Sequence, residues 1–400
     1  MKATQRVKKD SLREPPSPIS TKQYLALPDD ERQTYRPVHP KWERLPRWCF
    51  VLYGIGAVCL VLYWIMSQST AFADWFNSSV SAPLRTVAAA ITSPIPFSLA
   101  EFAIFLIPLI LFFLIRHAMR HYCDTWRSSA VFMGMLVSVA VGLFSIFVLN
   151  FAAGYRTTTL DKRLELDRAE VSAQELYDTA EILAQALNRE TANVSFYEND
   201  FSRMPYTISE LNDKLNDAYT GFAERYSFIH HADSRFKPVL ISELMSYTHI
   251  TGVYSFFTGE ANLNVHFPDY TLPYTAAHEM AHQRGIARED EANFIAFLVC
   301  IESDDAYMRY SAYLNLYEYV VVALRQADRE LYYKSLAHLN REIGAELDAY
   351  SRFYDRYRHS TASKVSSTVN NTFLQSQGTV GTRSYGMVVD LAVAYYKENG

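Results

Sequence analysis

The chain has 400 residues, enough for about two or three domains, and 49% of them are hydrophobic while 20% are charged. This balance excludes a disordered or low-complexity protein. The formal net charge of -5 gives no overall basic field, so we expect no nucleic-acid partner. Only four cysteines occur, scattered along the chain, and this excludes a disulfide framework or a cysteine-rich zinc module.

The N-terminal part of the chain predicts a tail followed by membrane spans. Residues 1–46 are rich in Pro, Ser, Lys and Arg and predict a flexible tail. Three apolar stretches follow, each about 20 residues long and so long enough to cross a bilayer; they cover roughly residues 48–66, 97–115 and 130–151. The first begins only after the long polar tail, which excludes a cleaved signal peptide. We predict a three-helix transmembrane region over residues 47–153.

The positions of the cations predict how these spans are oriented. Basic residues precede the first span and fill the connection between the second and third, whereas residues 67–96 offer only Arg85. The positive-inside rule then places the N-terminus in the cytoplasm and residues 154–400 outside it, with the chain in the cytoplasmic (inner) membrane and the lipid bilayer as a partner. We expect Glu101, near the outer end of the second span, to lie at the interface with water.

Residues 154–400 predict an α+β fold, mostly helical with a small sheet. Alternating polar and apolar residues predict a half-buried strand over Glu260–Phe267, with Glu260, Asn262 and Asn264 on its polar face. Residues 237–245 predict another short strand. Apolar residues at helical spacing predict the helices; these cover residues 161–188, 207–226, 275–285, 288–302, 304–326 and 329–357.

The helix over residues 275–285, which we expect Thr275 to cap and Gly285 to end, carries the run His278-Glu279-Met280-Ala281-His282. Two histidines four residues apart project from one face of a helix and can bind the same ion. Zn²⁺ suits this arrangement, because a catalytic zinc takes three protein ligands and a water. Glu279, beside the first histidine, can accept the proton of that water.

The third ligand is predicted at the start of the next helix. Glu289 is the first choice, and Glu291 becomes the ligand if the helix begins later than expected. Asn293 lies four residues after Glu289, on the same helix face, so its side-chain oxygen can accept the N–H of a ligating histidine.

The stretch from Gly259 to Cys300 resembles the zincin metallopeptidases. Its E-x-E-A-N run, Glu289 to Asn293, is similar to the E-x-x-A-D segment of membrane-bound gluzincins related to CAAX-prenyl and heat-shock proteases. In those gluzincins the glutamate helix comes much later in the chain and ends in Asp where this chain has Asn293. Arg288 stands where metzincins have their third histidine.

The likeness is closer to one particular family. The three spans, the run His278 to Gly285 and the run Ser384-Tyr385-Gly386 together resemble a bacterial family of membrane proteins catalogued only as a domain of unknown function. The zincin resemblance implies an edge strand beside the metal that pairs with an extended peptide, and Glu260–Phe267 is the candidate. Tyr385 or Arg383 is a candidate donor to the oxyanion of a tetrahedral intermediate.

Two functions fit these features. The first is a membrane-anchored zinc metallopeptidase, with Glu279 as general base, that acts on a peptide or protein substrate outside the cytoplasm. The alternative is a non-catalytic envelope protein that keeps the zincin fold, binds a partner and uses zinc for structure. Glu279 argues against the alternative, because a structural zinc site needs no base.

Overall fold

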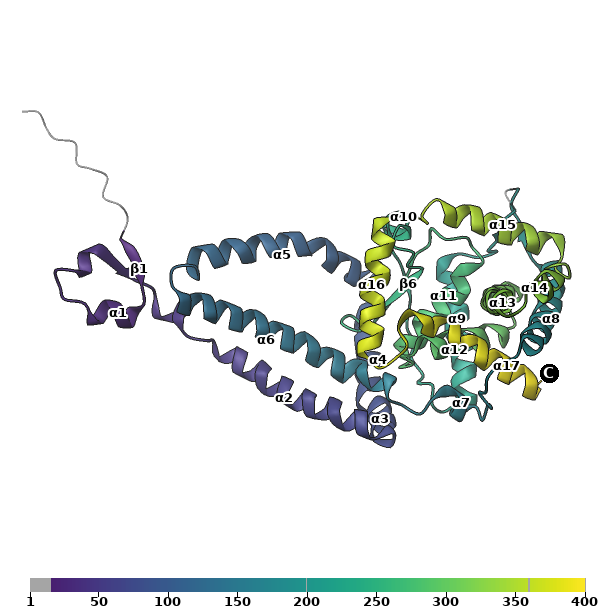
Figure 1. Cartoon of the computed structure of the whole chain (residues 1–400), viewed down its shortest axis with the longest axis horizontal. Coiled ribbons are helices and arrows are strands. Elements are labelled where there is room, and N and C mark those ends of the chain that lie inside the picture. The colour runs from purple at the N-terminus through teal and green to yellow at the C-terminus, as the bar shows by residue number, and fades with distance from the viewer. Residues whose placement is uncertain (1–15, 199, 359, 400) are drawn as a thin grey trace, which may run out of the picture. The chain divides into compact units, whose positions relative to one another are not determined.

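The computed structural model describes residues 16–198, 200–358 and 360–399 (Figure 1). Contacts between residues divide the chain into two compact units. The first unit takes residues up to 58 together with 105–145, and the second takes 59–104 together with 146 onwards. The second unit therefore contains the ends of the apolar stretches and the connection between the first two of them. It is mostly helical with small sheets, as the sequence predicts.

Among the described residues, three helices are long and apolar enough to cross a membrane, which confirms the prediction of three candidate spans. They are α2 (Arg47–Gln68), α5 (Leu99–His121) and α6 (Trp126–Asn150). Within the first unit, α2 and α6 approach closely, because a Cβ on Gly56 would lie 2.1 Å from Val141 Cγ1. The hydroxyl of Tyr53 donates to the carbonyl of Gly134 at 2.6 Å.

The N-terminal tail is more ordered than its composition predicts, at least from residue 16. Strand β1 (Ser17–Ile19) pairs in parallel with β2 (Tyr35–Pro37). Between them lies α1 (Thr21–Ala26), whose first turn is closed by a capping box of Ser20 and Gln23. Two 3₁₀ turns follow, η1 (Arg32–Thr34) and η2 (Pro40–Glu43). Residues 1–15 of the predicted flexible tail lie outside the described residues.

The connection between the first two candidate spans is helical and belongs to the second unit. It consists of α3 (Thr70–Phe76), the π-helical turn η3 (Asn77–Ser81) and α4 (Ala82–Thr92). Arg85 of α4 is buried, and its Nη1 donates to the carbonyl of Asn150 at 2.5 Å. Burial lowers the pKa of Arg85 to about 10, so the side chain stays charged at neutral pH. This segment is thus packed into the unit and does not form an open loop.

Helix α11 (Thr271–Gln283) lies in the middle of the second unit, in contact with the sheet and with α12 and α13 (Figure 1). Capping boxes begin two helices that cover this core, Ser172 with Glu175 and Thr207 with Glu210. The helices and 3₁₀ turns around α11 are η4 (Ala152–Tyr155), α7 (Leu160–Arg163), α8 (Ala173–Glu190), η5 (Thr191–Asn193), α9 (Ile208–Arg225), α10 (Ser242–Ser246), α12 (Glu289–Ile301), α13 (Ala306–Ala327), α14 (Arg329–Leu336), α15 (Arg341–Asp355), α16 (Thr361–Ser376), η6 (Gly381–Met387) and α17 (Val388–Asn399).

Two of the predicted helices are interrupted. The helix predicted over residues 161–188 is split into α7 and α8, since the capping box at Ser172 starts a new helix. The helix predicted over residues 329–357 is split into α14 and α15. The predictions for α9, α12 and α13 are confirmed to within a few residues.

The sheet of the second unit corrects the prediction of an edge strand. Its order is β5 (Lys237–Pro238), β7 (Glu260–Leu263) and β6 (Gly252–Ser255), with β5 parallel and β6 antiparallel to β7. The strand predicted over Glu260–Phe267 is therefore the central one, and it ends at Leu263. A separate hairpin pairs β3 (Ser195–Phe196) with β4 (Ser202–Arg203). The strand predicted over residues 237–245 gives way to α10 after Pro238.

The polar face of β7 is buried because its side chains find partners inside the unit. Glu260 is fully buried and lies 3.1 Å from Lys237 Nζ. Its carboxylate also accepts the backbone N–H groups of Leu99 and Ala100, in the first turn of α5. Lys237 Nζ in turn donates to the carbonyl of Thr92, the last residue of α4, at 2.6 Å. A pair of opposite charges thus joins the sheet to the start of the second candidate span.

Glu101 makes a similar contact, but here the carboxylate belongs to α5 and the backbone N–H groups belong to the segment before α10. Its carboxylate accepts the N–H groups of Leu240 at 3.0 Å and Ile241 at 2.9 Å. The side chain is buried against this segment. The position of Glu101 relative to the membrane interface stays a prediction. Glu101 holds the segment before α10 against α5.

We predict that Lys237→Met destabilises the protein by about 3–5 kcal/mol, because removal of one partner of a buried ion pair leaves the other charge without compensation. The double variant Lys237→Met/Glu260→Gln should recover part of this loss, since the neutral amide can still accept the N–H of Leu99. Unfolding of the full chain in lipid nanodiscs measures both effects. A double variant less stable than the single one would contradict the prediction.

Candidate metal centre

The helix that carries the two histidines starts earlier than predicted. Helix α11 begins at Thr271, so Thr275 lies inside it and caps nothing. Pro273 fits in the first turn, where backbone N–H groups have no partner within the helix and the missing N–H of proline costs nothing. The N–H of Tyr274 donates instead to the hydroxyl of Ser311, at 3.1 Å. A side chain of another helix therefore stabilises the first turn of α11, and the N-cap residue makes no capping hydrogen bond of its own.

The end of α11 follows the prediction. Gly285 has a φ of +97°, which glycine adopts without strain. Its N–H donates to the carbonyl of His282, and the N–H of Ile286 donates to that of Ala281. These two bonds make a Schellman turn. Gly285 is also tightly surrounded, because a Cβ there would lie 2.3 Å from Arg85 Nη2.

The turn orients the second histidine. The carbonyl of Ile286 lies 2.7 Å from His282 Nδ1, and since a carbonyl can only accept, Nδ1 carries the proton. Nε2, which faces Glu289, is then the nitrogen through which His282 would bind a metal once it has lost its proton. His278 has no matching support, because its buried Nδ1 has no hydrogen-bond partner among the described residues.

Glu289 lies opposite the two histidines, at the first position of α12. Its Oε2 is 3.2 Å from His278 Nε2 and 3.4 Å from His282 Nε2. One ligand atom from each of the three residues lies within 4.8 Å of the others, and all three side chains are buried. Two imidazole nitrogens and one carboxylate oxygen form a donor set that zinc accepts. These three residues could hold a metal ion.

The neighbours of Glu289 have other partners. Glu291 accepts the N–H of Leu160 at 3.0 Å and forms an ion pair with Arg288 at 2.9 Å. Asn293 does not support a histidine as predicted; its Nδ2 donates to the carbonyl of Tyr385 at 3.2 Å. Asn293 instead joins α12 to η6. Of the two carboxylates considered, only Glu289 lies with the histidines.

The electrostatics of the three residues favour a bound cation. Burial alone would raise the pKa of Glu289, but the neighbouring His282 and His278 rings lower it well below its usual value. Burial alone would lower the pKa of His282, whereas Glu289 raises it to about 9. The carboxylate is thus held ionised next to two nitrogen ligands. This is the charge distribution that a divalent cation needs.

Glu279 lies between the histidines and β6. The backbone N–H of Tyr254 donates to its carboxylate. A Cβ on Gly252 would lie 2.6 Å from Glu279 Oε1, so only glycine leaves room for this carboxylate. Burial raises the pKa of Glu279, and the rings of His278 and His282 oppose this increase. The sequence did not predict that β6 lies next to Glu279, because the pattern of one strand does not show which strands pair with it.

Of the two candidate oxyanion donors, only Tyr385 is near the site. Its ring stacks over that of His278 with 6.5 Å between centroids, and its side chain hydrogen-bonds to Glu289. Burial, together with Glu289, raises the pKa of Tyr385 well above its usual value, so the hydroxyl keeps its proton. Arg383 is exposed. Asn370 of α16 donates to the hydroxyl of Tyr385 at 3.3 Å.

Aromatic residues that the sequence analysis did not single out close the other side of the site. The ring of Phe151 meets that of His282 edge to face at 5.8 Å between centroids. Tyr155 is buried, and burial together with Glu289 raises the pKa of its hydroxyl. Phe151 and Tyr155 follow α6 directly, so the end of the third candidate span forms part of the wall.

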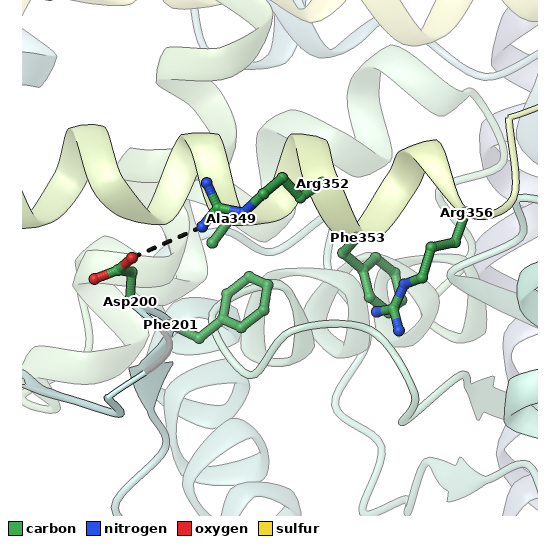
Figure 2. A pocket seen from close by; sticks show the side chains of 6 residues that line it. All are labelled: Asp200, Phe201, Ala349, Arg352, Phe353 and Arg356. Atoms are coloured by element: carbon green, nitrogen blue, oxygen red, sulfur yellow. Dashed lines mark ion pairs between the residues drawn. The ribbon is translucent and has the colours of Figure 1, made fainter.

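A separate hollow of about 340 Å³ lies against α15, where Arg352 forms an ion pair with Asp200 at 3.7 Å (Figure 2). It is lined by Asp200, Phe201, Ala349, Arg352, Phe353 and Arg356. None of the candidate metal ligands is among these residues, so the hollow is no part of the metal centre.

Residues 76–393 match the model of a family described as Protein of unknown function (DUF3810). The match covers more than half of the chain, and the chain therefore belongs to this family. No curated protein and no solved structure matches it. The resemblance to a family of unknown function is thus confirmed, whereas the resemblance to zincins stays a prediction.

We predict that the purified full chain binds one zinc ion and that Glu289→Gln weakens this binding at least about 100-fold, since loss of a mere supporting group already costs about 10- to 100-fold. Glu291→Gln is the matched control, because Glu291 is equally buried but is bound to Leu160 and Arg288. Metal content after dialysis against buffered zinc measures both. Retention of zinc by Glu289→Gln, or its loss from Glu291→Gln alone, would contradict the assignment.

Proposed function

We propose that this protein is a membrane-anchored zinc metallopeptidase of the zincin type, which hydrolyses peptide bonds outside the cytoplasm. The observation that carries the proposal is the arrangement of His278, His282 and Glu289 around one point, with Glu279 beside them. A structural zinc site has no use for a fourth, unbound carboxylate next to its ligands. A hydrolytic site needs one as a base.

The donor set of His278, His282 and Glu289 would hold the zinc. A zinc ion bound by three protein ligands supplies Lewis acidity and makes water acidic enough to lose a proton near neutral pH. His282 is held for this task by the carbonyl of Ile286, which fixes the ring tautomer.

Glu279 is the proposed general base. Its carboxylate is buried, and the N–H of Tyr254 holds it in place. Burial raises its pKa, which makes the carboxylate a better proton acceptor than an exposed one. It can take a proton from the attacking water and then pass it to the leaving amine.

Strand β6 is the proposed peptide-binding edge, in place of the strand first predicted. In the described sheet β6 pairs with β7 on one side only. Its residues Gly252 and Tyr254 lie directly at Glu279. An extended peptide paired with the other side of β6 would present its backbone to the base.

Tyr385 is the proposed donor to the oxyanion. Its hydroxyl is protonated, lies at Glu289 and is held by Asn370. A phenol so placed can stabilise negative charge that develops on a carbonyl oxygen.

The proposed location is the cytoplasmic (inner) membrane. The N-terminus lies in the cytoplasm and residues 154–400 form an extracytoplasmic zincin-like domain. The support is the distribution of Lys and Arg around three candidate spans. A peptide or protein substrate outside the cytoplasm follows from this orientation.

We predict that Glu279→Gln lowers peptide hydrolysis about 100- to 10,000-fold, the usual contribution of a general base. Zinc content should not change, because Glu279 is not a ligand. The matched control is Glu342→Gln, at an exposed position in the first turn of α15. Hydrolysis of a fluorogenic peptide library and metal content measure the two effects. A Glu279→Gln protein that cleaves as fast as the wild type would contradict the role of Glu279 as general base.

The alternative function, a non-catalytic protein with structural zinc, is favoured by one observation, the burial of all three ligands. Removal of the metal separates the two. A catalytic zinc should leave the fold intact when a chelator removes it, and re-addition of zinc should restore hydrolysis. Removal of a structural zinc should lower the unfolding temperature of wild type and Glu279→Gln alike. Circular dichroism during chelation, in nanodiscs, measures the difference.

A further inference from the structure

Large apolar side chains are exposed on one side of the second unit. Outside the candidate spans and the connection between the first two, they concentrate on α10, β6, α16 and the segments that follow them. Leu240 is 78% exposed and Val369 is 64% exposed. We call this set the apolar rim; it comprises Leu240, Leu244, Tyr247, Val253, Phe257, Val365, Val369 and Val380. Figure 1 shows α10, β6 and α16 on the same side of the unit as α4.

The rim is built directly onto the ends of the candidate spans. Glu101, in the first turn of α5, binds the backbone of Leu240. Phe147, near the end of α6, contacts both Phe256, next to the rim residue Phe257, and Phe373 of α16. These contacts place the rim where the apolar helices leave the second unit.

The connection between the spans continues the rim. Leu84, Val87 and Ile91 are spaced along one face of α4 and are 42%, 57% and 68% exposed. An exposed apolar stripe on a helix that connects two candidate membrane spans is typical of an interfacial helix. Figure 1 shows α4, which carries this stripe, on the same side of the unit as the elements of the rim.

The charge of the rim suits a lipid surface. The chain carries no Asp or Glu from Arg356 to Val389, a stretch that includes all of α16, whereas Lys364 and Arg383 are exposed in it. Glu243 is the single acid of α10. A mostly basic, apolar surface matches anionic headgroups above acyl chains.

We propose that the apolar rim lies in the headgroup region of the lipid bilayer, so that the second unit rests on the membrane surface as well as being attached to it. The bilayer is the occupant because the rim is continuous with the spans and carries few acids. This holds whether or not the metal centre is catalytic.

Fluorescence quenching tests the proposal in the full chain, reconstituted in nanodiscs of phosphatidylcholine and phosphatidylglycerol. Cys123 is the exposed cysteine and is replaced by serine, while Cys49, Cys59 and Cys300 are buried. An environment-sensitive fluorophore is attached to Val369→Cys or, separately, to Leu244→Cys. Lipids with a spin label near the headgroup quench from the bilayer, and iodide quenches from water.

Control labels go on positions that are similarly exposed but lie away from the rim. Val322→Cys on α13 and Tyr333→Cys on α14 serve, since these residues are 57% and 65% exposed. Spin-labelled lipid should lower the fluorescence of the rim labels at least about twofold more than that of the controls, because an interfacial surface sinks about 5–10 Å into the headgroup boundary. Iodide should show the reverse order.

Two outcomes would overturn the proposal. If iodide quenches the rim labels as strongly as the controls and the spin-labelled lipids do not, the rim is open to water. If neither quencher reaches the rim labels, protein covers the rim, either a second copy or a partner. Agreement between the two rim positions guards against an effect of one substitution on folding.

Discussion

The buried ion pair of Lys237 and Glu260 is the interaction on which the second unit depends. Glu260 accepts the N–H groups at the start of α5, and Lys237 donates to the carbonyl of Thr92 at the end of α4. Without the ion pair, the carbonyl at the end of α4 and the N–H groups at the start of α5 would be buried without partners. Such a loss costs several kcal/mol. The pair thereby joins the central strand of the sheet to a candidate membrane span.

The sheet in turn positions the metal centre. Strand β7 contacts α11, and β6 places the N–H of Tyr254 at Glu279. The far end of α11 is fixed by the turn at Gly285, where Asn77 Nδ2 donates to the carbonyl of Gly285 at 3.3 Å. Both ends of the site therefore rest on residues that lie between the first two candidate spans. The group of two histidines and a glutamate is buried at the meeting point of these contacts.

Local periodicity explains how much of the site was predictable. The spacing of His278 and His282, the glycine that ends their helix and the carboxylate at the start of the next helix all lie within a dozen residues of one another. Geometry over such a short span follows from helix periodicity and one turn. The sequence therefore predicted that His278, His282 and Glu289 lie together, with Glu291 as the rival to Glu289.

The errors have one physical cause, which is pairing between distant residues. Alternation along Glu260–Phe267 predicted a strand, and the resemblance to zincins implied that it is an edge strand. The alternation of one segment could not reveal the two neighbours that make it central. The burial of Glu101 and Glu260 was not predicted, because their partners are more than a hundred residues away in the chain. Thr275 was taken for a cap because the true start of α11 depends on Ser311 of another helix. No pattern within one segment reveals such contacts.

The position of Asn77 and Arg85 between two hydrophobic helices has a practical consequence. A fragment that starts after the third helix, at residue 154, keeps every candidate ligand but lacks the groups that bind Gly285 and pair with the sheet. Shedding of this fragment by a protease would separate it from these partners. The connection between the first two candidate spans is thus also a wall of the folded unit, and the candidate metal centre cannot be cut free of those spans without losing that wall.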